Sequence, residues 1–475
     1  MKILLIYPSN PYYNSKEIPS LSMDHFSLKT GKFSNFLIRS YVKSFLNKKI
    51  KLNSKPLLYP HIALLSLRNL SHPHDVDFHD DYVDFITKKH LEGFNKYDLI
   101  GLNVLTQSAK RSYELYNLLK PLNIPIVLGG SHISAFPEDA KNHCDILGIG
   151  PAESYWEKML LDIEKHQTNK IYHGEYNPSM INKYRYYSSG YEEFNSFGYL
   201  PVTIPVYSRG CNNNCSFCFI PDFRPKWHSR DMDELVQDLI KAGNKQVFFC
   251  DANLAPDKKT LKIFLKKLKK LKKHNIYWAS NISLDLFDEE TPSLLKESNC
   301  NHVNIGIESL TTLETKIPSI NFAEYIISKL HNLGITIKCC FILGYIKDTE
   351  KSFDSIKKFI IDNGLDFFDI ASLVPYPGTR LHNSLKARKL LKTYDYDQYI
   401  IESNELVIKH PLKNYSLLFD SLLFNLYSSG NMYLRLKNNL LWKKNILTML
   451  YVLFINIINY FSIRKYKKYK KQNGL

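Results

Sequence analysis

The chain lacks the features that mark secreted and disulfide-bonded proteins. Its first residues, Met1–Tyr7, are too few for the apolar core of a signal peptide and fit a first β-strand instead. Only 8 cysteines occur among 475 residues, and a long chain with no secretory segment is rarely a disulfide framework. We therefore expect reduced cysteines and a cytoplasmic location.

The chain is also short of acidic residues. It has 46 aspartates and glutamates against 63 lysines and arginines, which gives a formal net charge of +17. The lysines are spread along the chain, so the charge does not by itself indicate a nucleic-acid partner, and we expect none. Apolar residues make up 44% of the chain, enough for the cores of two to four domains.

Three of the cysteines stand in one short loop, Cys211, Cys215 and Cys218, with the spacing C-x3-C-x2-C. A structural zinc site usually needs four ligands in paired groups, and no second pair follows; His228 fits no common zinc spacing. Three thiolates can instead hold three irons of a 4Fe-4S cluster and leave the fourth iron open for a ligand. The other cysteines read as core residues or free thiols: Cys144, Cys250, Cys300, Cys339 and Cys340.

In residues 1–170, apolar runs alternate with helical patterns. The expected strands are Ile3–Tyr7, Val76–His79, Leu99–Val104, Ile126–Leu128 and Ile146–Ile149, and the expected helices are Ile62–Leu70, Ala109–Leu119 and Ala152–Lys165. This alternation predicts a doubly wound, flavodoxin-like parallel sheet. Glycines follow two strands, in Gly129-Gly130-Ser131 and at Gly148. They are either ordinary turn residues or leave room for a large ligand at the carboxyl edge of the sheet.

Residues 171–199 read as a linker, and residues 200–385 hold six strand–helix units. The expected strands are Val202–Tyr207, Gln246–Cys250, Tyr277–Ser280, His302–Gly306, Thr336–Phe341 and Phe367–Leu373. Helices between them include Asp231–Ala242, Lys259–Lys273 and Lys351–Ile361. Six such units predict a partial (β/α)6 barrel of the TIM type, whose site lies at the carboxyl ends of the strands.

Polar and glycine residues gather where these strands end. Asp251 and Asn253 follow the second strand, Asn281 the third, Glu308 the fourth and Gly344 the fifth. Each has a plain structural alternative, since the first two can cap a helix and Glu308 can be a solvated carboxylate. With the cysteine loop after the first strand and Pro375-Tyr376-Pro377-Gly378-Thr379 after the sixth, six motifs lie on one rim, which favours a functional site.

Residues 386–475 read as a small helical region with an apolar stretch near its end. Ile446–Ile463 carries no charge over 18 residues, with Lys443 and Lys444 before it and a basic tail after it. This is the short limit for a membrane span. At ~100° per residue, four polar residues fall within roughly 120° of one another: Thr448, Asn456, Asn459 and Ser462. We expect an amphipathic helix on the inner face of a membrane, with a spanning helix and a core helix as the alternatives.

With Phe217 before its third cysteine, the loop has the form C-x3-C-x-aromatic-C and resembles the radical S-adenosylmethionine (SAM) superfamily. Further motifs over residues 1–385 are similar to the subgroup with an N-terminal cobalamin-binding domain. They are Asp251-Ala252-Asn253-Leu254, Gly306-Ile307-Glu308-Ser309, Gly344-x3-Asp348-Thr349-Glu350, Pro375-Tyr376-Pro377-Gly378-Thr379, Gly129-Gly130-Ser131-His132 and Gly148-x-Gly-x-x-Glu153.

The chain departs from that subgroup in three places. The signature Asp-x-His-x-x-Gly, in which histidine coordinates cobalt, does not occur, and many members of the subgroup lack it too. Gly150-Pro151-Ala152-Glu153 replaces the usual Gly-Glu-x-Glu. The segment from about Pro11 to Leu57 reads as an insertion of unknown role.

The resemblance implies a radical SAM enzyme. Cys211, Cys215 and Cys218 would hold the cluster as thiolates, the open iron would bind the methionyl group of SAM, and reduction would release a deoxyadenosyl radical. The resemblance also implies which residues would contact SAM. The backbone at Phe219 would meet adenine, Asp251 or Asn253 the methionyl amine, and Glu308 the methionyl or ribose groups; Asn281, Gly344 and Phe217 would complete the site.

Cobalamin would lie at Gly129, Gly130, Ser131 and Gly148 and hand a methyl group to an unactivated carbon of a small-molecule or lipid substrate. An external donor of the flavodoxin or ferredoxin type would supply electrons. Cobalamin-dependent C-methylation is therefore the leading hypothesis. The same cofactors also fit cyclisation, rearrangement or oxidation, and the cysteine loop alone fits a non-catalytic iron–sulfur or zinc protein.

Overall fold

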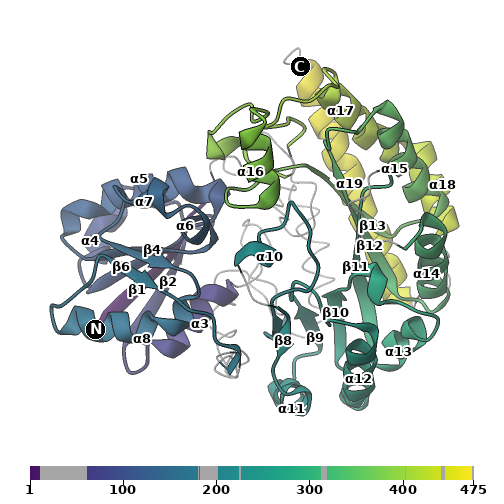
Figure 1. Ribbon diagram of the computed structural model, residues 1–475. Helices are drawn as coiled ribbons and strands as arrows, with labels where there is room; N and C mark the ends of the chain where they lie inside the picture. Colours follow the sequence, from purple (N-terminus) through teal and green to yellow (C-terminus); the bar gives the residue numbers. More distant parts are fainter. Residues whose placement is uncertain are drawn as a thin grey trace.

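The computed structural model describes residues 1–10, 61–179, 181, 202–223, 226–311, 318–401, 403–439, 444 and 446–472. These residues form a six-stranded parallel sheet, a five-stranded parallel sheet and a group of C-terminal helices (Figure 1). The expected α/β class, a flavodoxin-like sheet followed by a partial barrel, is confirmed. The insertion expected at 11–57 lies outside the described residues.

The N-terminal sheet has the strand order β2-β1-β3-β4-β5-β6, and all neighbours are parallel. Its strands are β1 (Lys2–Tyr7), β2 (Asp75–Asp80), β3 (Leu99–Asn103), β4 (Ile126–Gly129), β5 (Ile146–Ile149) and β6 (Ile171–His173). The first five follow the flavodoxin order. Strand β6 falls in the expected linker; only its central residue, Tyr172, is buried, so no apolar run marks it in the sequence.

Both faces of this sheet are covered, which explains its nearly continuous apolar strands. Leu4 and Ile6 of β1 pack with α5 (Ala109–Leu119), whereas Ile3 and Leu5 pack with α3 (Ile62–Leu70) and α8 (Trp156–Glu164). Two short helices, α6 (Ser131–Ala135) and α7 (Pro137–Ala140), connect β4 to β5.

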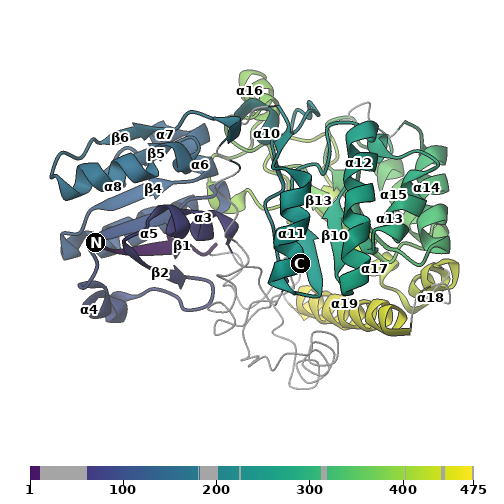
Figure 2. The same ribbon diagram turned by 90° about the horizontal axis from the view of Figure 1, so that it is seen from below.

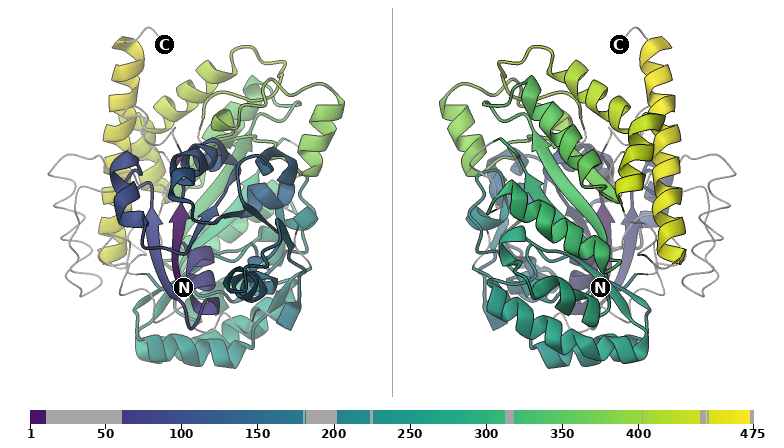
Figure 3. Two further views of the ribbon diagram at one scale, coloured as in Figure 1. Left: turned by 90° about the vertical axis from the view of Figure 1, so that its left-hand side faces the viewer. Right: turned by 90° about the vertical axis from the view of Figure 1, so that its right-hand side faces the viewer.

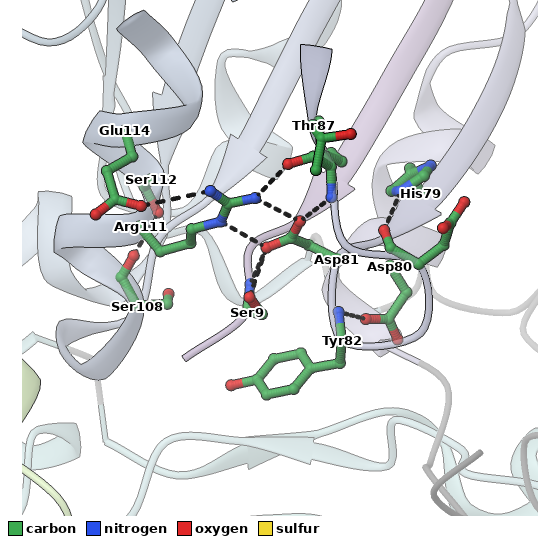
Figure 4. Close-up of polar contacts among 12 residues, drawn as sticks. Ser9, His79, Asp80, Asp81, Tyr82, Thr87, Ser108, Arg111, Ser112 and Glu114 are labelled. Atoms are coloured by element: carbon green, nitrogen blue, oxygen red, sulfur yellow. Dashed lines mark hydrogen bonds and ion pairs between the residues drawn. The ribbon is translucent and has the colours of Figure 1, made fainter. Parts of the chain in front are cut away.

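A buried ion pair fastens the loops at the carboxyl edge of β1 and β2 (Figure 4). The Arg111 guanidinium donates from Nε and Nη2 to Asp81 at 2.9 and 3.0 Å, and Asp81 also accepts from the backbone N–H groups of Ser9 and Ile86. Burial alone would raise the pKa of Asp81, but these donors together lower it. The pair therefore fixes the chain just after β1, on the same edge as the glycine turns.

The second sheet has the order β13-β12-β11-β10-β9 and is also entirely parallel. Its strands are β9 (Gln246–Phe249), β10 (Tyr277–Asn281), β11 (Cys300–Glu308), β12 (Thr336–Leu343) and β13 (Phe367–Ser372). The helices on its outer side are α11 (Met232–Ala242), α12 (Lys258–Leu268), α13 (Thr291–Glu297), α14 (Ile320–Asn332) and α15 (Glu350–Asp362) (Figures 1 and 2).

The first barrel strand expected from the sequence, Val202–Tyr207, does not form a regular strand. It contributes one parallel bridge, between Thr203 and Val247 of β9. Pro205 has no backbone N–H and so removes one bond of the ladder. The segment nevertheless occupies the expected edge, beside β9, and leads into the cysteine loop.

The C-terminal helices are α16 (Arg380–Ala387), α17 (Tyr415–Leu426), α18 (Ser429–Asn438) and α19 (Ile446–Gln472). Helices α17, α18 and α19 pack on the barrel, and α19 runs along an outer edge of the molecule (Figures 2 and 3). The described part of the chain contains no helix of the length and apolarity that crossing a bilayer requires, which contradicts the spanning alternative.

Polar residues near the centre and start of the α19 region are bonded inside the protein and do not face water. Asn456 is 1% exposed and donates to the backbone oxygens of Asp366 and Val452 at 3.2 and 2.8 Å, and it also pairs with Arg435. Lys444, expected as a basic flank, is buried against Asp366 at 3.3 Å. Polar groups at the amino end of β13 therefore draw the polar side of α19 inward.

Candidate active site

The cysteine loop begins directly after a short antiparallel ladder at the barrel rim. The ladder pairs β7 (Ser208–Arg209) with β8 (His228–Ser229), and Gly210 then turns the chain with a φ of 80°. Only glycine adopts this conformation without strain. The loop thus starts in a fixed direction from the rim.

Helix α16 holds the middle of the loop. The carbonyl of Ser216 accepts from the backbone N–H of Leu381 at 3.0 Å, and the carbonyl of Cys215 accepts from Arg380 Nη2 at 3.2 Å. Within the loop, the N–H of Cys218 donates to the carbonyl of Cys215 at 3.2 Å. On the loop's side, these three bonds use backbone atoms and no thiol group.

Cys211, Cys215 and Cys218 are all partly exposed and in no disulfide. Nowhere among the described residues do three His, Cys, Asp or Glu side chains converge as they would around a single metal ion. In a 4Fe-4S cluster each thiolate binds a different iron, whereas a zinc ion needs its ligands gathered around one atom.

Four of the other five cysteines have thiols with a raised pKa, whereas the fifth, Cys250, is exposed and so is not a core residue. Burial raises the pKa of the Cys144 thiol to about 11, and it raises the thiol pKa of Cys300, Cys339 and Cys340 as well. Such thiols stay protonated and are poor ligands, as expected for core residues.

Asp251 follows β9 and lies directly beneath the start of the cysteine loop. Its Oδ1 accepts from both the backbone N–H and the hydroxyl of Ser208, the latter at 2.7 Å. The side chain is 5% exposed, and its other oxygen, Oδ2, is buried without a hydrogen-bond partner in the described structure. Burial raises the pKa of Asp251 to about 6, although the bonds from Ser208 and the nearby Arg209 lower it.

An unpartnered carboxylate oxygen in the protein interior is costly unless a donor reaches it. Such an oxygen at the rim, beside the cysteine loop, fits an ammonium group supplied by a ligand. The amine of SAM is a group of this kind.

The asparagines of the rim are connected to Asp251, directly for Asn281 and through Ser208 for Asn253, because the Ser208 hydroxyl contacts both Asp251 Oδ1 and, at 3.3 Å, the Asn253 carbonyl. Asn281, at the end of β10, donates to the Asp251 carbonyl at 3.5 Å and accepts from Asn304 at 2.9 Å. Asn253 accepts from the N–H of Ser283 at 3.4 Å and is 4% exposed. The structure therefore brings Asp251, Asn253 and Asn281 together.

Glu308 ends β11 in an unusual conformation. Its φ is 62°, a region that non-glycine residues rarely adopt, and the pairing with β12 shifts register between Gly306 and Glu308. A Cβ on Gly306 would lie 2.4 Å from Glu308 Oε1. Gly306 is thus required so that the carboxylate can fold back over the strand end. Strain of this kind recurs at functional sites.

Gly344 and Phe217 each have a structural role. Gly344 follows β12 with a φ of 105°, and its N–H donates to Asp348 at 2.8 Å; a Cβ there would lie 2.5 Å from Leu406. Phe217 packs against the barrel core. The turn explains Gly344 and core packing explains Phe217, and both positions are compatible with contact to a cofactor.

A cavity of about 310 Å³ opens at the carboxyl edge of the N-terminal sheet. Gly129, Gly130 and Ser131 line it, as expected. Gly148 does not; a Cβ there would lie 2.0 Å from the hydroxyl of Tyr155, so this glycine makes room for a side chain that forms the wall.

The walls of this cavity are mostly apolar and come from both sheets. Leu5, Leu64, Leu102, Val127 and Trp156 belong to the N-terminal sheet and its helices. From the barrel side, Phe219, just after the cysteine loop, and Phe223, at the end of α10 (Ile220–Phe223), also line it, stacked with ring centroids 4.2 Å apart. The side chain of Phe219 therefore points to this cavity.

An ion pair crosses the same cavity. Glu153 lies 3.7 Å from Arg209 Nη2, and both line the cavity, at 15% and 20% side-chain exposure. Arg209 directly precedes Gly210 and Cys211 in the sequence. The pair connects the turn after β5 to the start of the cysteine loop. Glu153 has a sequence signal, the Gly-x-Gly-x-x-Glu motif, whereas Arg209 and Ser208 have none.

Comparison with known proteins agrees with this arrangement. Residues 206–360 match the family model described as the radical SAM superfamily. The bacteriochlorophyllide d C-8(2)-methyltransferase of Chlorobaculum tepidum is 29% identical over 422 residues, which cover 84% of this chain and 89% of the relative.

Two solved structures share the two-sheet fold. The radical SAM methyltransferase TsrM from Kitasatospora setae, described with cobalamin and a 4Fe-4S cluster bound, matches with a TM-score of 0.57 and 14% identity over 82% of this chain and 75% of TsrM. The cobalamin-dependent SAM radical enzyme OxsB matches with a TM-score of 0.58 and 14% identity over 100% of this chain and 81% of OxsB. With the cysteine loop on the barrel rim, these matches mean that residues 206–360 form a domain of the radical SAM type and that the chain shares the two-sheet fold of these structures.

Proposed function

We propose that this chain is a radical SAM enzyme that methylates an unactivated carbon with the help of cobalamin. The observation that carries the proposal is the position of the three-cysteine loop. The loop sits on the rim of a partial barrel and shares a cavity with the glycine-lined edge of the N-terminal sheet. Two cofactors held at these places would lie next to each other.

Cys211, Cys215 and Cys218 would hold the 4Fe-4S cluster. When bound and reduced, the cluster supplies the electron that breaks the sulfonium bond of SAM. Asp251 would accept from the methionyl ammonium through Oδ2, the atom left without a donor. Glu308 would bind a further polar group of SAM, and Asn253 and Asn281 hold the rim around Asp251.

The cavity on the N-terminal sheet would take the nucleotide tail of cobalamin. Ligand pockets usually measure roughly 300–1,000 Å³, so 310 Å³ suits one lobe of the cofactor and not the whole corrin. No histidine is among the described residues that line the cavity, which fits a cobalamin held without histidine on cobalt. When bound as methylcobalamin, the cofactor supplies the methyl group.

Methylation is favoured over the other radical outcomes by the C. tepidum relative, which is named as a methyltransferase and aligns over most of both chains. That enzyme acts on bacteriochlorophyllide d. For this chain we propose a small-molecule substrate that enters between the sheet edge and the barrel rim, and an external donor of the flavodoxin or ferredoxin type. The protein would act in the cytoplasm. Peripheral membrane contact does not follow from this chemistry and rests on the surface of α19 alone.

The test is anaerobic reconstitution of the full chain with iron, sulfide and methylcobalamin. We expect four irons per chain, cobalamin that stays bound through gel filtration, a change in the cluster's electron paramagnetic resonance spectrum on adding SAM, and SAM cleavage under reduction. A protein that binds no cobalamin and leaves SAM intact would refute the proposal. Mass spectrometry of the product then separates methylation, which adds one methyl group, from rearrangement, which adds none.

A further inference from the structure

The exposed face of α19 is apolar along most of its length. Four large side chains stand out of the protein there: Ile446, Leu450, Ile457 and Phe461, exposed by 68, 51, 47 and 62%. At ~100° per residue they fall within an arc of about 60°. They form one stripe along α19, the helix that lies at an outer edge of the molecule in Figures 2 and 3.

The stripe continues into basic residues on the same face. At the same ~100° per residue, Arg464, Lys468 and Lys471 share the angular range of the apolar stripe to within about 20°, and all three are exposed. No acidic residue occurs anywhere in α19. The face is therefore apolar over its first four turns and positively charged over its last two.

The rest of α19 is fastened to the protein, so this face keeps its orientation. Val452 and Ile455 pack with Phe367 at the start of β13, and Ile463 joins the barrel core. Asn459 donates to the hydroxyl of Tyr427 at 3.1 Å.

The basic end is attached as well. The Tyr466 hydroxyl donates to Asp420 of α17 at 3.4 Å, and the Lys467 ammonium lies 5.2 Å from the ring centre of Phe424. Stripe and basic end thus form one rigid surface, which we call the α19 face.

We propose that the α19 face binds a bilayer surface that contains anionic lipid. Apolar side chains in line along a helix enter the boundary between headgroups and acyl chains, and lysines and arginines on the same face bind anionic headgroups. The charge of the α19 face favours lipid over a second copy of the chain. In a parallel contact between two copies, Arg464, Lys468 and Lys471 would lie against the same positive charges. In an antiparallel contact, α19 would offer them no acidic partner.

The interior side of α19 explains why the helix can serve this purpose. Asn456 and Asn459 are bonded inside the protein, so the exposed stripe of the helix is apolar, the reverse of a water-facing surface helix. The inference does not depend on the proposed reaction, since no residue of the α19 face touches the cavity or the rim.

The experiment is co-sedimentation of the full chain with two kinds of vesicle, phosphatidylcholine alone and phosphatidylcholine mixed with phosphatidylglycerol. We expect the protein to sediment with the anionic vesicles and to stay in solution with the neutral ones. The double variant Leu450→Ser/Phe461→Ser should reduce binding at least about tenfold, because it removes half of the stripe. The triple variant Arg464→Glu/Lys468→Glu/Lys471→Glu should abolish the preference for anionic vesicles.

Matched controls come from exposed residues elsewhere. Leu161→Ser on α8 removes an apolar side chain that is 52% exposed, and Lys258→Glu/Lys259→Glu on α12 reverses exposed charges; neither should change vesicle binding. Circular dichroism and SAM cleavage in solution should be unchanged in every variant, which separates this inference from the proposed reaction.

Three results would overturn the inference. The first is a wild-type protein that ignores anionic vesicles. The second is a double variant that binds as well as wild type, since apolar contact would then play no part. The third is a dimer, seen by light scattering, that the double variant dissociates, since a second copy would then cover the face. If the serine variant fails to fold, Phe461→Trp replaces it, and its fluorescence should shift to the blue with anionic vesicles only.

Discussion

The two sheets each present a carboxyl edge to the candidate site, but they do so with opposite chemistry. At the edge of the N-terminal sheet, Gly129 and Gly130 leave space for a ligand, and the cavity walls are mostly apolar. The rim of the barrel is built by polar groups, with Asp251 just after β9 and Glu308 at the end of β11. The same parallel architecture thus gives one edge that would select its ligand by shape and another that would select its ligand by charge.

This difference matches what each edge is proposed to hold. SAM carries an ammonium, a carboxylate and a sulfonium, and small charged ligands are fixed by paired charges and hydrogen bonds. The nucleotide tail of cobalamin is bulky, so a roomy apolar slot suits it. The comparison predicts that changes at the rim act on SAM, and that changes at the glycine edge act on cobalamin.

The largest effect is expected where the two edges meet, at the cysteine loop. Cys215→Ala removes one of three ligands, so cluster iron and SAM cleavage should fall to background. Iron analysis and the visible absorption of the reconstituted protein measure this. Cys144→Ala is the matched control: its thiol has a pKa raised to about 11 by burial and should be dispensable. Retention of a SAM-responsive cluster in the Cys215 variant would show that other residues are the ligands.

The next effect is expected at Asp251 on the charged rim. In Asp251→Asn the amide oxygen can keep the bonds from Ser208, but an amide N–H₂ replaces the unpartnered Oδ2. Losing a charge-assisted hydrogen bond costs about 1.5–3 kcal/mol, or roughly 10- to 150-fold in SAM affinity. Cobalamin affinity should not change, and the exposed helix cap variant Asp257→Asn should leave both affinities as they are.

The pKa of Asp251 adds a pH test. Because burial raises this pKa to about 6, the carboxylate is lost as the pH falls through about 6, and wild-type SAM affinity should weaken there. The asparagine variant should lack this dependence. An aspartate whose pKa is raised by folding costs stability above that pKa, so the variant should melt no lower than wild type at neutral pH. Equal SAM affinity across this pH range in wild type would contradict the assignment.

A smaller, selective effect is expected at the glycine edge. A Cβ on Gly129 would have only ordinary contacts, 3.5 Å from the Tyr155 hydroxyl and 3.7 Å from the Gly148 carbonyl. Gly129→Ala should therefore be mild, whereas Gly129→Leu should fill the cavity and weaken cobalamin binding by about 5- to 150-fold, as overpacking of about 1–3 kcal/mol implies. Equilibrium dialysis of cobalamin measures this. Equal loss of SAM binding in the leucine variant would mean that the two edges are not independent.

How much of this could be predicted from sequence depends on the distance along the chain between partners. The cysteine loop and the glycine turns are contiguous motifs, and the alternation of strands and helices marks both sheets. The hydrogen bond between Ser208 and Asp251 joins residues 43 positions apart, and no local sequence pattern predicts it. The strand β6 was missed for a different reason, since it is short and half exposed.

Helix α19 shows the limit most clearly. Helical periodicity correctly groups its polar residues on one side, but it does not say which side is buried. That depends on Asp366 and Arg435, whose backbone and side-chain atoms bond Asn456. Which residues share a helical face could thus be predicted from the sequence, whereas which face is buried depends on residues distant in the chain.

The smallest effect is expected where the two edges are joined by the ion pair between Glu153 and Arg209. At 3.7 Å and with both side chains partly exposed, the pair should contribute only about 0.2–1 kcal/mol. Glu153→Gln should therefore leave SAM and cobalamin affinities within about fivefold of wild type.

Its effect should appear in the coupling of the two cofactors. If the pair positions the cysteine loop against the cavity, Glu153→Gln should lower the amount of methylated product per SAM cleaved, and Glu153→Asp should restore part of it. Added salt should lower the same ratio in wild type but not in the glutamine variant, because salt screens partly exposed charges. Glu157→Gln, an exposed neighbour outside the cavity, is the control. A product ratio unchanged in Glu153→Gln would mean that the charged rim and the glycine edge are aligned by packing alone.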